Sequence, residues 1–223
     1  MFISKKGRKM IKKGITIPLQ NINLYGNLNI PDSANGLVIF VHGSGSSRFS
    51  PRNNFVADVI NKAGLATLLF DLLTEQEDII DEQTRQFRFD IPLLAKRLIE
   101  VSYWITQQEN LKHLNLGYFG SSTGAAAALI GAAELPQLIK AVVSRGGRTD
   151  LADTFLPRVK AATLCIVGAL DDVVIQMNQE SLAQINAKKE LIIIPGATHL
   201  FEEPGTLEKV ANEATQWFIN YLS

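Results

Sequence analysis

The stretch GYFGSSTGAAAAL, residues 117–129, joins a run of strand-forming residues to an alanine-rich helix through a tight turn that holds two serines. Its centre, Gly120-x-Ser122-x-Gly124, fits the pattern G-x-S-x-G, in which a serine sits on a sharp strand-to-helix turn with its hydroxyl exposed. Ser122 is selected over Ser121 because only Ser122 has glycines at the required spacing. A turn of small residues that merely packs a helix onto a sheet would read the same way. The partners available to the serine therefore decide between the two interpretations.

The composition is that of an ordinary globular domain. The chain has 223 residues, of which 46% are apolar, and 22 basic residues balance 22 acidic ones. Zero net charge gives a polyanion such as DNA no overall electrostatic attraction. The basic residues that do gather lie within residues 1–13, which we expect to be a solvated and partly frayed end.

Cysteine content and hydropathy restrict the compartment. The single cysteine, Cys165, lies in an apolar run, so a disulfide within the chain is impossible and a cysteine metal site is not expected. Neither a signal peptide nor a run of ~18 apolar residues is visible. We expect a cytoplasmic protein whose partner is a small molecule, without metal, cofactor, nucleic acid or membrane. The sequence predicts no oligomeric state.

The order of predicted elements indicates the fold class. Apolar and periodic runs predict strands at 14–19, 22–30, 36–41, 65–70, 114–119, 139–144, 162–168 and 189–195, and helices at 50–64, 90–108, 122–134, 176–187 and 206–222. Repeated strand–helix units predict one α/β domain over residues 1–223, with a mostly parallel sheet covered by helices on both faces. Residues 71–89 show no clear period and either form a lid over a pocket or connect two elements on the surface. No segment is long enough for a large cap domain.

Loops that follow the predicted strands should carry the chemistry, because ligands bind at the carboxyl ends of parallel strands. A serine nucleophile needs a base. His199 follows the last strand and is the best candidate. His42 stands directly at a strand end, where it more plausibly shapes its own loop, and His113 precedes its strand and should lie at the opposite edge.

An acid is needed to orient that base. Asp171 comes early in the loop after the penultimate strand and is preferred, with Asp172 as an exposed neighbour or helix cap. Asp150 and Asp153, after the preceding strand, are weaker rivals. The order serine, aspartate, histidine along the chain is that of α/β-hydrolases and differs from those of chymotrypsin and subtilisin.

Two backbone donors are expected to stabilise a developing oxyanion. One is the N–H of Thr123, just after the serine, and the other is the N–H of Ser44 in the loop HGSGSS, residues 42–47. That loop is neither a Walker loop nor a dinucleotide fingerprint, because it lacks the Gly-Lys-Ser/Thr ending and the third glycine. Arg145 and Arg148 follow another strand at the same edge. They could bind a substrate carboxylate, and the alternative for both is surface pairing or helix capping.

With these residues in place, the chain resembles the α/β-hydrolase superfamily from about Gly14 to its end, and within it the cap-less, dienelactone-hydrolase-like proteins. The segments VHGSGSS, GYFGSSTG, VGALDDVV and PGATHLF carry the resemblance. It implies a sheet of about eight strands with the second antiparallel to the rest. Dienelactone hydrolases proper place a cysteine at the centre of the elbow, where this chain has Ser122. The resemblance therefore implies acyl-serine hydrolysis more strongly than it implies dienelactone as the substrate.

The sequence thus favours a serine hydrolase that cleaves a small ester, lactone or thioester with Ser122, Asp171 and His199. Two alternatives remain open at this point. One is a non-catalytic binding protein on the same fold, and the other is a peptidase or acyltransferase that uses the same three residues.

Overall fold

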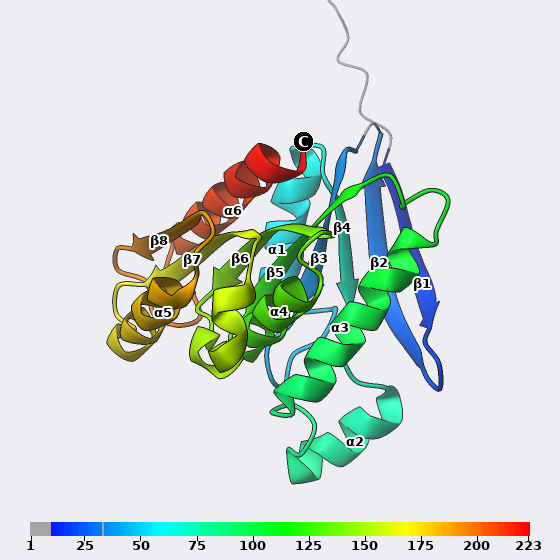
Figure 1. The fold of residues 1–223 in the computed structure, drawn as a ribbon, viewed down its shortest axis with the longest axis horizontal. Coiled ribbons are helices and arrows are strands. Elements are labelled where there is room, and N and C mark those ends of the chain that lie inside the picture. The colour runs from blue at the N-terminus through cyan, green and yellow to red at the C-terminus, as the bar shows by residue number, and fades with distance from the viewer. Residues whose placement is uncertain (1–9, 33) are drawn as a thin grey trace, which may run out of the picture.

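The computed structural model describes residues 10–32 and 34–223, and a twisted eight-stranded sheet runs through their centre (Figure 1). The strand order is β1-β2-β4-β3-β5-β6-β7-β8. β2 is antiparallel to both of its neighbours, and the other pairs are parallel. The strands are β1 Met10–Pro18, β2 Asn23–Pro31, β3 Gly36–Val41, β4 Ala66–Phe70, β5 Asn115–Ser121, β6 Ile139–Arg145, β7 Ala162–Gly168 and β8 Lys189–Ile194. The predicted α/β fold, including the antiparallel second strand, is confirmed.

Helices cover both faces of this sheet. α1 and α6 lie on one face, and α3, α4, α5 and the 3₁₀ helix η1 lie on the other (Figure 1). The helices are α1 Pro51–Lys62, α2 Glu75–Thr84, α3 Ile91–Thr106, α4 Thr123–Glu134, α5 Asp172–Gln184 and α6 Thr206–Leu222, and η1 spans Thr149–Arg158. Among the described residues, no helix is both long and apolar enough to span a bilayer.

Successive side chains of the central strands pack alternately into two separate hydrophobic cores. Ile39 of β3 packs in the cluster under α3 and α4, whereas its neighbour Phe40 packs in the cluster under α1 and α6. This alternation is the period of two that any strand imposes, and both positions are apolar because both faces are covered.

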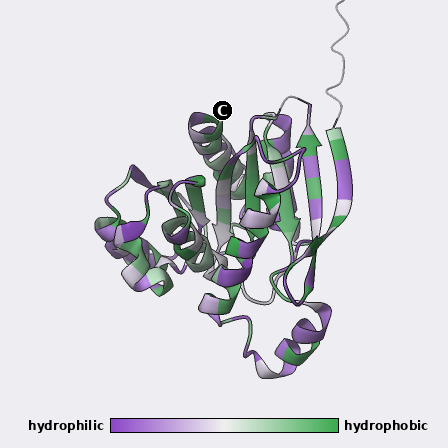
Figure 2. Cartoon of the chain, turned by 45° about the vertical axis from the view of Figure 1, so that its right-hand side comes forward, coloured by the Kyte–Doolittle hydropathy of each residue, from purple (hydrophilic) through white to green (hydrophobic). Residues whose placement is uncertain are grey.

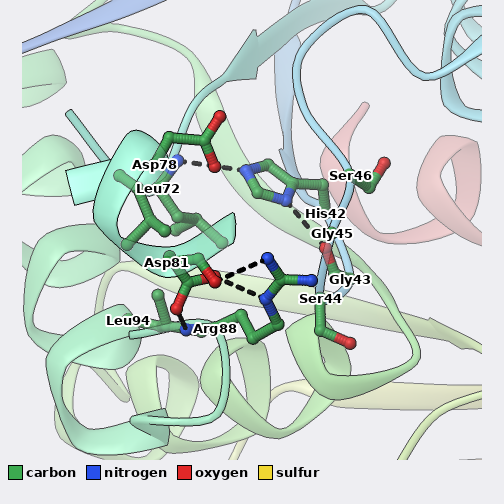
Figure 3. Close-up of a pocket in the computed structure, with 11 residues that line it drawn as sticks. His42, Gly43, Ser44, Gly45, Ser46, Leu72, Asp78, Asp81, Arg88 and Leu94 are labelled. Carbon is green, nitrogen blue, oxygen red and sulfur yellow. Dashed lines mark hydrogen bonds and ion pairs between the residues drawn. The ribbon is translucent and has the colours of Figure 1, made fainter. Parts of the chain in front are cut away.

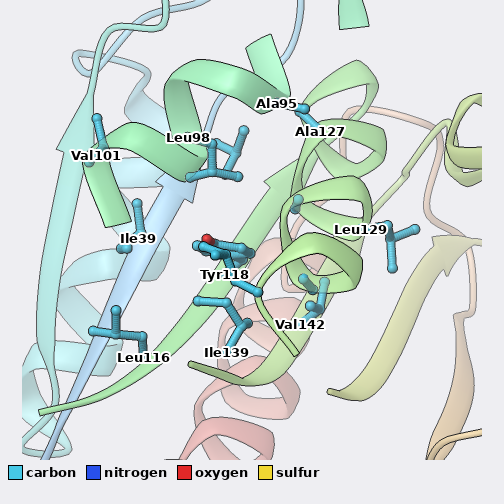
Figure 4. Close-up of a cluster of buried hydrophobic side chains, with 14 of the residues drawn as sticks. Ile39, Ala95, Leu98, Val101, Leu116, Tyr118, Ala127, Leu129, Ile139 and Val142 are labelled. Atoms are coloured by element: carbon cyan, nitrogen blue, oxygen red, sulfur yellow. The ribbon is translucent and has the colours of Figure 1, made fainter. Parts of the chain in front are cut away.

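Figure 4 shows Tyr118 among aliphatic side chains of the first cluster. Its hydroxyl reaches Ser102 at 2.6 Å, so the buried polar end is satisfied. In Figure 2 the central strands are mostly hydrophobic, and hydrophilic residues lie on the outer sides of the helices.

The start of α1 follows the predicted capping pattern. The Ser50 hydroxyl accepts the N–H of Asn53, and Pro51 occupies the first turn, where its missing N–H is not needed. The helix ends at Lys62, and Gly64 takes a φ of 100° just beyond it. These local signals therefore set both ends of the helix.

Two expectations about segment boundaries are wrong. Residues 10–13 are not frayed, because they pair with residues 28–31 of β2 as the first part of β1; residues 1–9 lie outside the described residues. α5 begins at Asp172, four residues before the expected position 176 and directly after Asp171, the predicted acid.

Residues 71–89 also differ from expectation, because they contain the regular helix α2. A capping box begins it: the Thr74 hydroxyl accepts the Glu77 N–H, and the Glu77 carboxylate accepts the Thr74 N–H. The Thr-x-x-Glu signature was readable in the sequence, but the helix lacks the apolar stripe that normally reveals one. Asp81, 1% exposed, then accepts the N–H groups of Phe87 and Arg88 at 2.7 and 3.0 Å and pairs with the Arg88 guanidinium.

We predict that Asp81→Ala will loosen the turn after α2. Two backbone N–H groups and a guanidinium would lose a common acceptor, which leaves partly buried donors unsatisfied. Hydrogen exchange should accelerate across residues 85–90, while the β5 amides exchange as before. Asp78→Ala, at an exposed position of the same helix, is the matched control. Equal exchange in both variants would show that Asp81 does not hold this turn.

Candidate active site

The predicted site lies where the order of the sheet reverses. β3 lies between β4 and β5, so the chain proceeds to one side after β3 and to the other side from β5 onwards. A crevice forms at the carboxyl ends of such strands because their connections diverge to opposite faces. Val41, the last residue of β3, pairs with Gly120 of β5. The HGSGSS loop and the Ser122 turn therefore start side by side.

Ser122 has the backbone of a strained turn. Its φ of 50° and ψ of −122° lie in a region that side chains disfavour. A Cβ on Gly124 would come within 2.2 Å of the Val41 carbonyl oxygen, and one on Gly120 within 2.5 Å of the Ala125 Cα. Both glycines of the motif are thus required by close backbone packing.

Backbone hydrogen bonds hold Ser122 in this conformation. Its N–H donates to the Arg145 carbonyl at 3.2 Å, and its own carbonyl accepts from Ala125 at 3.1 Å and from Arg148 at 3.0 Å. The turn after β6 therefore clamps the serine from the neighbouring strand. Ser121 instead points to the α1 face, where its buried hydroxyl donates to Asn53 Oδ1 at 3.0 Å. The structure accordingly separates the two serines by environment, with only Ser122 partly exposed.

His199 comes from β8, three strands away from β5. Strands are spaced ~4.8 Å apart, so its loop must bend back over the sheet edge to approach Ser122. Two glycines lie next to this crossing. A Cβ on Gly168 would lie 2.4 Å from the Ala197 carbonyl oxygen, and one on Gly146 would lie 3.4 Å from the His199 ring. The loop therefore passes over the ends of β7 and β6.

The structure brings Asp171 and His199 together. Asp171 Oδ2 lies 2.6 Å from His199 Nδ1, and the carboxylate is mostly buried while the imidazole is partly exposed. Asp171 occupies the N-cap position of α5, yet its side chain makes no capping bond. The Asp171 carboxylate thus accepts a hydrogen bond from His199 on another loop and does not cap the N-terminus of its own helix. Asp172, the first residue of α5, is exposed.

The loop that carries His199 is fixed on both sides of the histidine. Glu203 accepts the hydroxyl of Thr198 at 2.6 Å and its N–H at 3.1 Å. Phe201 is 2% exposed and packs into the α1–α6 core. With these two anchors, the imidazole is held by packing and by Asp171. Among the described residues the Ser122 hydroxyl makes no hydrogen bond to His199, and such bonds are often long in free enzymes.

The predicted oxyanion donors meet in an unexpected way. The Ser44 N–H donates to the Thr123 hydroxyl at an N–O distance of 2.9 Å. A Cβ on Gly43 would be only 3.2 Å from the Ser122 Cβ, so this loop lies directly against the serine. The sequence placed Ser44 and Thr123 at one site, but the part played by the Thr123 side chain was missed.

His42 supports this loop from beneath, as expected. Its Nδ1 donates to the Gly43 carbonyl at 3.0 Å, and its Nε2 accepts the Leu72 N–H at 3.1 Å (Figure 3). A carbonyl can only accept and an amide N–H can only donate, so the ring is neutral with its proton on Nδ1. Burial lowers the pKa of His42 below its ordinary value, and the bond to Gly43 and the charge of Asp78 offset this only in part.

The matches to known proteins follow this geometry. The model of the dienelactone hydrolase family covers residues 24–222. The chain belongs to the dienelactone hydrolase family. A crystal structure of dienelactone hydrolase from Anabaena variabilis is 54% identical, with a TM-score of 0.95 over 96% of this chain and 99% of that one. Carboxyl esterase 2 from the fungus Tuber melanosporum shares only the fold, at 15% identity, with a TM-score of 0.76 over 98% of this chain and 90% of the other.

A second relative has a different name. A Mycobacterium tuberculosis (strain CDC 1551) protein, provisionally named a phosphoribosyl transferase, is 55% identical over 197 residues. The match covers 88% of this chain but 44% of that protein. This dienelactone hydrolase family chain therefore spans less than half the length of the curated relatives it matches.

The arginines at the edge of this dienelactone hydrolase fold have different surroundings. Arg148 donates to both oxygens of the Asp150 carboxylate, at 2.9 and 2.8 Å, which matches the surface-pairing alternative. Arg145 is 8% exposed, and burial, together with the positive charge of Arg52 in α1, lowers its pKa to about 10. Neither contact tests whether a substrate carboxylate binds, and a carboxylate at Arg148 would compete with Asp150.

Cys165 cannot take the place of the elbow cysteine of dienelactone hydrolases proper. It is buried in β7, and burial raises the pKa of its thiol to about 12. A thiol that stays protonated is a poor nucleophile. If an amino-acid side chain of this chain attacks a carbonyl, the residue at the elbow is therefore the candidate.

We predict that His42 makes the fold acid-sensitive. Its folded pKa is lowered, so below the ordinary value near ~6.5 the unfolded chain takes up a proton that the folded chain refuses. Between pH 7.5 and pH 5 the free energy of unfolding should fall by up to about 2 kcal/mol more in the natural protein than in His42→Gln. Urea unfolding at several pH values measures this.

His113→Gln, a change at an exposed histidine, controls for the loss of a histidine as such. If His42→Gln loses stability with acid as steeply as the natural protein, then His42 is not the source of the acid sensitivity.

Proposed function

We propose that this protein is a serine hydrolase that cleaves a small carboxylic ester, lactone or thioester through an acyl-Ser122 intermediate. The observation that carries the proposal is the 2.6 Å bond between Asp171 and His199, on a loop bent back toward a serine held at φ 50°. Membership of a hydrolase family supports it. A turn that only packed α4 onto the sheet would require neither the mostly buried Asp171 carboxylate nor the crossing of the His199 loop over β7 and β6.

The geometry suggests how the three residues would act. Asp171 accepts a hydrogen bond from Nδ1–H, which leaves the lone pair of His199 Nε2 for the Ser122 proton. As Ser122 Oγ bonds to the substrate carbonyl carbon, the C=O electron pair moves onto oxygen and the serine proton passes to Nε2. The imidazolium then protonates the leaving group as the carbonyl re-forms. Water repeats the sequence on the acyl-enzyme and restores Ser122.

The charge on the carbonyl oxygen requires donors beside Ser122. In our proposal the Thr123 N–H, at the first position of α4, and the loop of Ser44 supply them. The Thr123 N–H stands at the N-terminus of α4, where partial positive charge also favours an anion. Donors that are fixed before the reaction need no reorganisation when the charge develops.

Exposed apolar side chains adjoin the acid and the base. Leu170 precedes Asp171, Leu200 follows His199, and Val173 is the second residue of α5; all three are exposed. Apolar atoms at this edge favour a carbon-rich acyl or alcohol group in the substrate. A role of Arg145 and Arg148 in binding a substrate carboxylate remains part of the proposal.

The transferase name of the mycobacterial relatives does not alter the proposal. The matched 44% of that protein corresponds to the region in which this chain fits the hydrolase family. We therefore assign the phosphoribosyl transferase name to the length that this chain does not cover. Assaying the present chain for ester hydrolysis tests that assignment directly.

We predict that a fluorophosphonate probe will label Ser122. The probe phosphonylates activated serines, so the natural protein should be labelled and Ser122→Ala should not. Ser121→Ala is the matched control, since it removes a buried hydroxyl bonded to Asn53 and should retain labelling. Peptide mass spectrometry locates the label. Absence of labelling on folded natural protein would favour a binding role, and a label on Ser121 would move the nucleophile.

We also predict that Asp171→Asn will lower kcat by ~10³ to 10⁴, because His199 would lose its orienting charge and adopt the wrong tautomer. Asp172→Asn, at the exposed neighbour, should stay within about twofold. Steady-state hydrolysis of a short-chain aryl ester provides the measurement. Equal losses in both variants, or a large loss only in Asp150→Asn, would contradict the choice of Asp171.

A further inference from the structure

One hydrogen bond joins the two predicted oxyanion elements through a side chain. The Ser44 N–H donates to the Thr123 Oγ1 at 2.9 Å, across 79 positions of sequence. Ser44 belongs to the loop after β3, and Thr123 is the first residue of α4. The Ser44 N–H, which was expected to donate to the substrate oxygen, therefore donates to the Thr123 hydroxyl in this structure.

The Thr123 hydroxyl keeps one hydrogen to donate. Its oxygen accepts from Ser44, and among residues 10–32 and 34–223 its own O–H donates to no side chain or backbone oxygen. Thr123 is only 4% exposed, so bulk water does not readily satisfy this group. Buried donors in native proteins nearly always have a partner, and an O–H without one next to a predicted nucleophile points to a ligand atom.

The placement of the hydroxyl fits a partner at Ser122. Thr123 follows Ser122 directly, and the Gly43–Ser44 segment that bonds the hydroxyl also packs against the Ser122 side chain. The Thr123 hydroxyl and the Ser122 side chain thus both lie next to the Gly43–Ser44 backbone. An oxygen bonded to the carbon that Ser122 attacks would be placed in this region.

We propose that the Thr123 hydroxyl is an oxyanion donor: it accepts the Ser44 N–H and donates its own O–H to the oxygen that becomes negative when Ser122 attacks. The inference rests on the proposed hydrolase function. The hydroxyl keeps its proton throughout, while the serine proton goes to His199 as described above. The N–H bond to the oxygen polarises the hydroxyl and makes it a stronger donor, and donation to an anion is stronger than donation to a neutral carbonyl. Thr123 would then contribute both its backbone N–H and its side chain.

Thr123→Val and Thr123→Ser form the decisive pair. Valine keeps the shape and lacks the hydroxyl, so kcat/KM should fall by roughly 10²-fold with KM changed little, the usual effect of one lost oxyanion donor. Serine keeps the hydroxyl and should remain within about fivefold of the natural protein. Thr123→Cys retains a weak S–H donor and should fall between the two.

A transition-state analogue separates this role from a structural one. A trifluoromethyl ketone adds the serine hydroxyl and forms a hemiketal oxyanion, so its inhibition constant in Thr123→Val should rise by the same factor as kcat/KM falls. Thermal unfolding of each variant shows that it is folded. If valine perturbs folding, the comparison of serine with cysteine carries the same test.

Natural-like kcat/KM and ketone affinity in Thr123→Val would overturn the inference, because the Ser44 N–H would then reach the oxyanion directly. Such a result would leave the hydrolase function intact, since the natural protein would still hydrolyse esters and react with fluorophosphonate. A natural protein that does neither would overturn both the function and this inference.

Discussion

The proposed site depends on one geometric requirement: a histidine that leaves the sheet at β8 must approach a serine at the end of β5. The loop after β8 meets that requirement by crossing the ends of β7 and β6. A Cβ on Gly168 would lie 2.4 Å from the Ala197 carbonyl oxygen, and Gly146 has a φ of 52°, which favours glycine. Phe201 and Glu203 anchor the same loop, and Asp171, which follows β7, accepts a hydrogen bond from the His199 imidazole. Side-chain orientation at the site therefore follows from backbone packing between non-neighbouring strands.

On the opposite side of the serine, the loop after β3 is held by residues from several parts of the chain. His42 connects it to Leu72 after β4, and Thr123 connects it to the start of α4. A Cβ on Gly45 would lie 3.2 Å from the guanidinium of Arg88, which Asp81 fixes to α2 (Figure 3). Residues 71–89 thus form a wall beside this loop. Fixed donors of this kind are what electrostatic stabilisation of an oxyanion needs, because they do not reorganise during the reaction.

Several local features are unfavourable for folding and cluster around this site. Ser122 has a strained backbone, and Asp171 bonds His199 and does not cap its own helix. Within residues 10–32 and 34–223, one guanidinium nitrogen of the buried Arg145 has no partner. Each costs stability that the two hydrophobic cores must offset. Strain and unused capping potential are expected where function sets the geometry. Elsewhere the sequence and the local structure agree, as at the start of α1.

The sequence alone predicted the α/β class, the eight strands, most helix boundaries and the residues now grouped at the sheet edge, because apolar periodicity and turn chemistry are local signals. It did not reveal α2, whose helix is specified by a capping box and a buried aspartate without an apolar stripe. Nor could it reveal that the Ser44 N–H bonds the Thr123 side chain or that Arg145 is buried. These contacts join residues far apart in the chain, and only the tertiary packing of adjacent strands brings them within bonding distance.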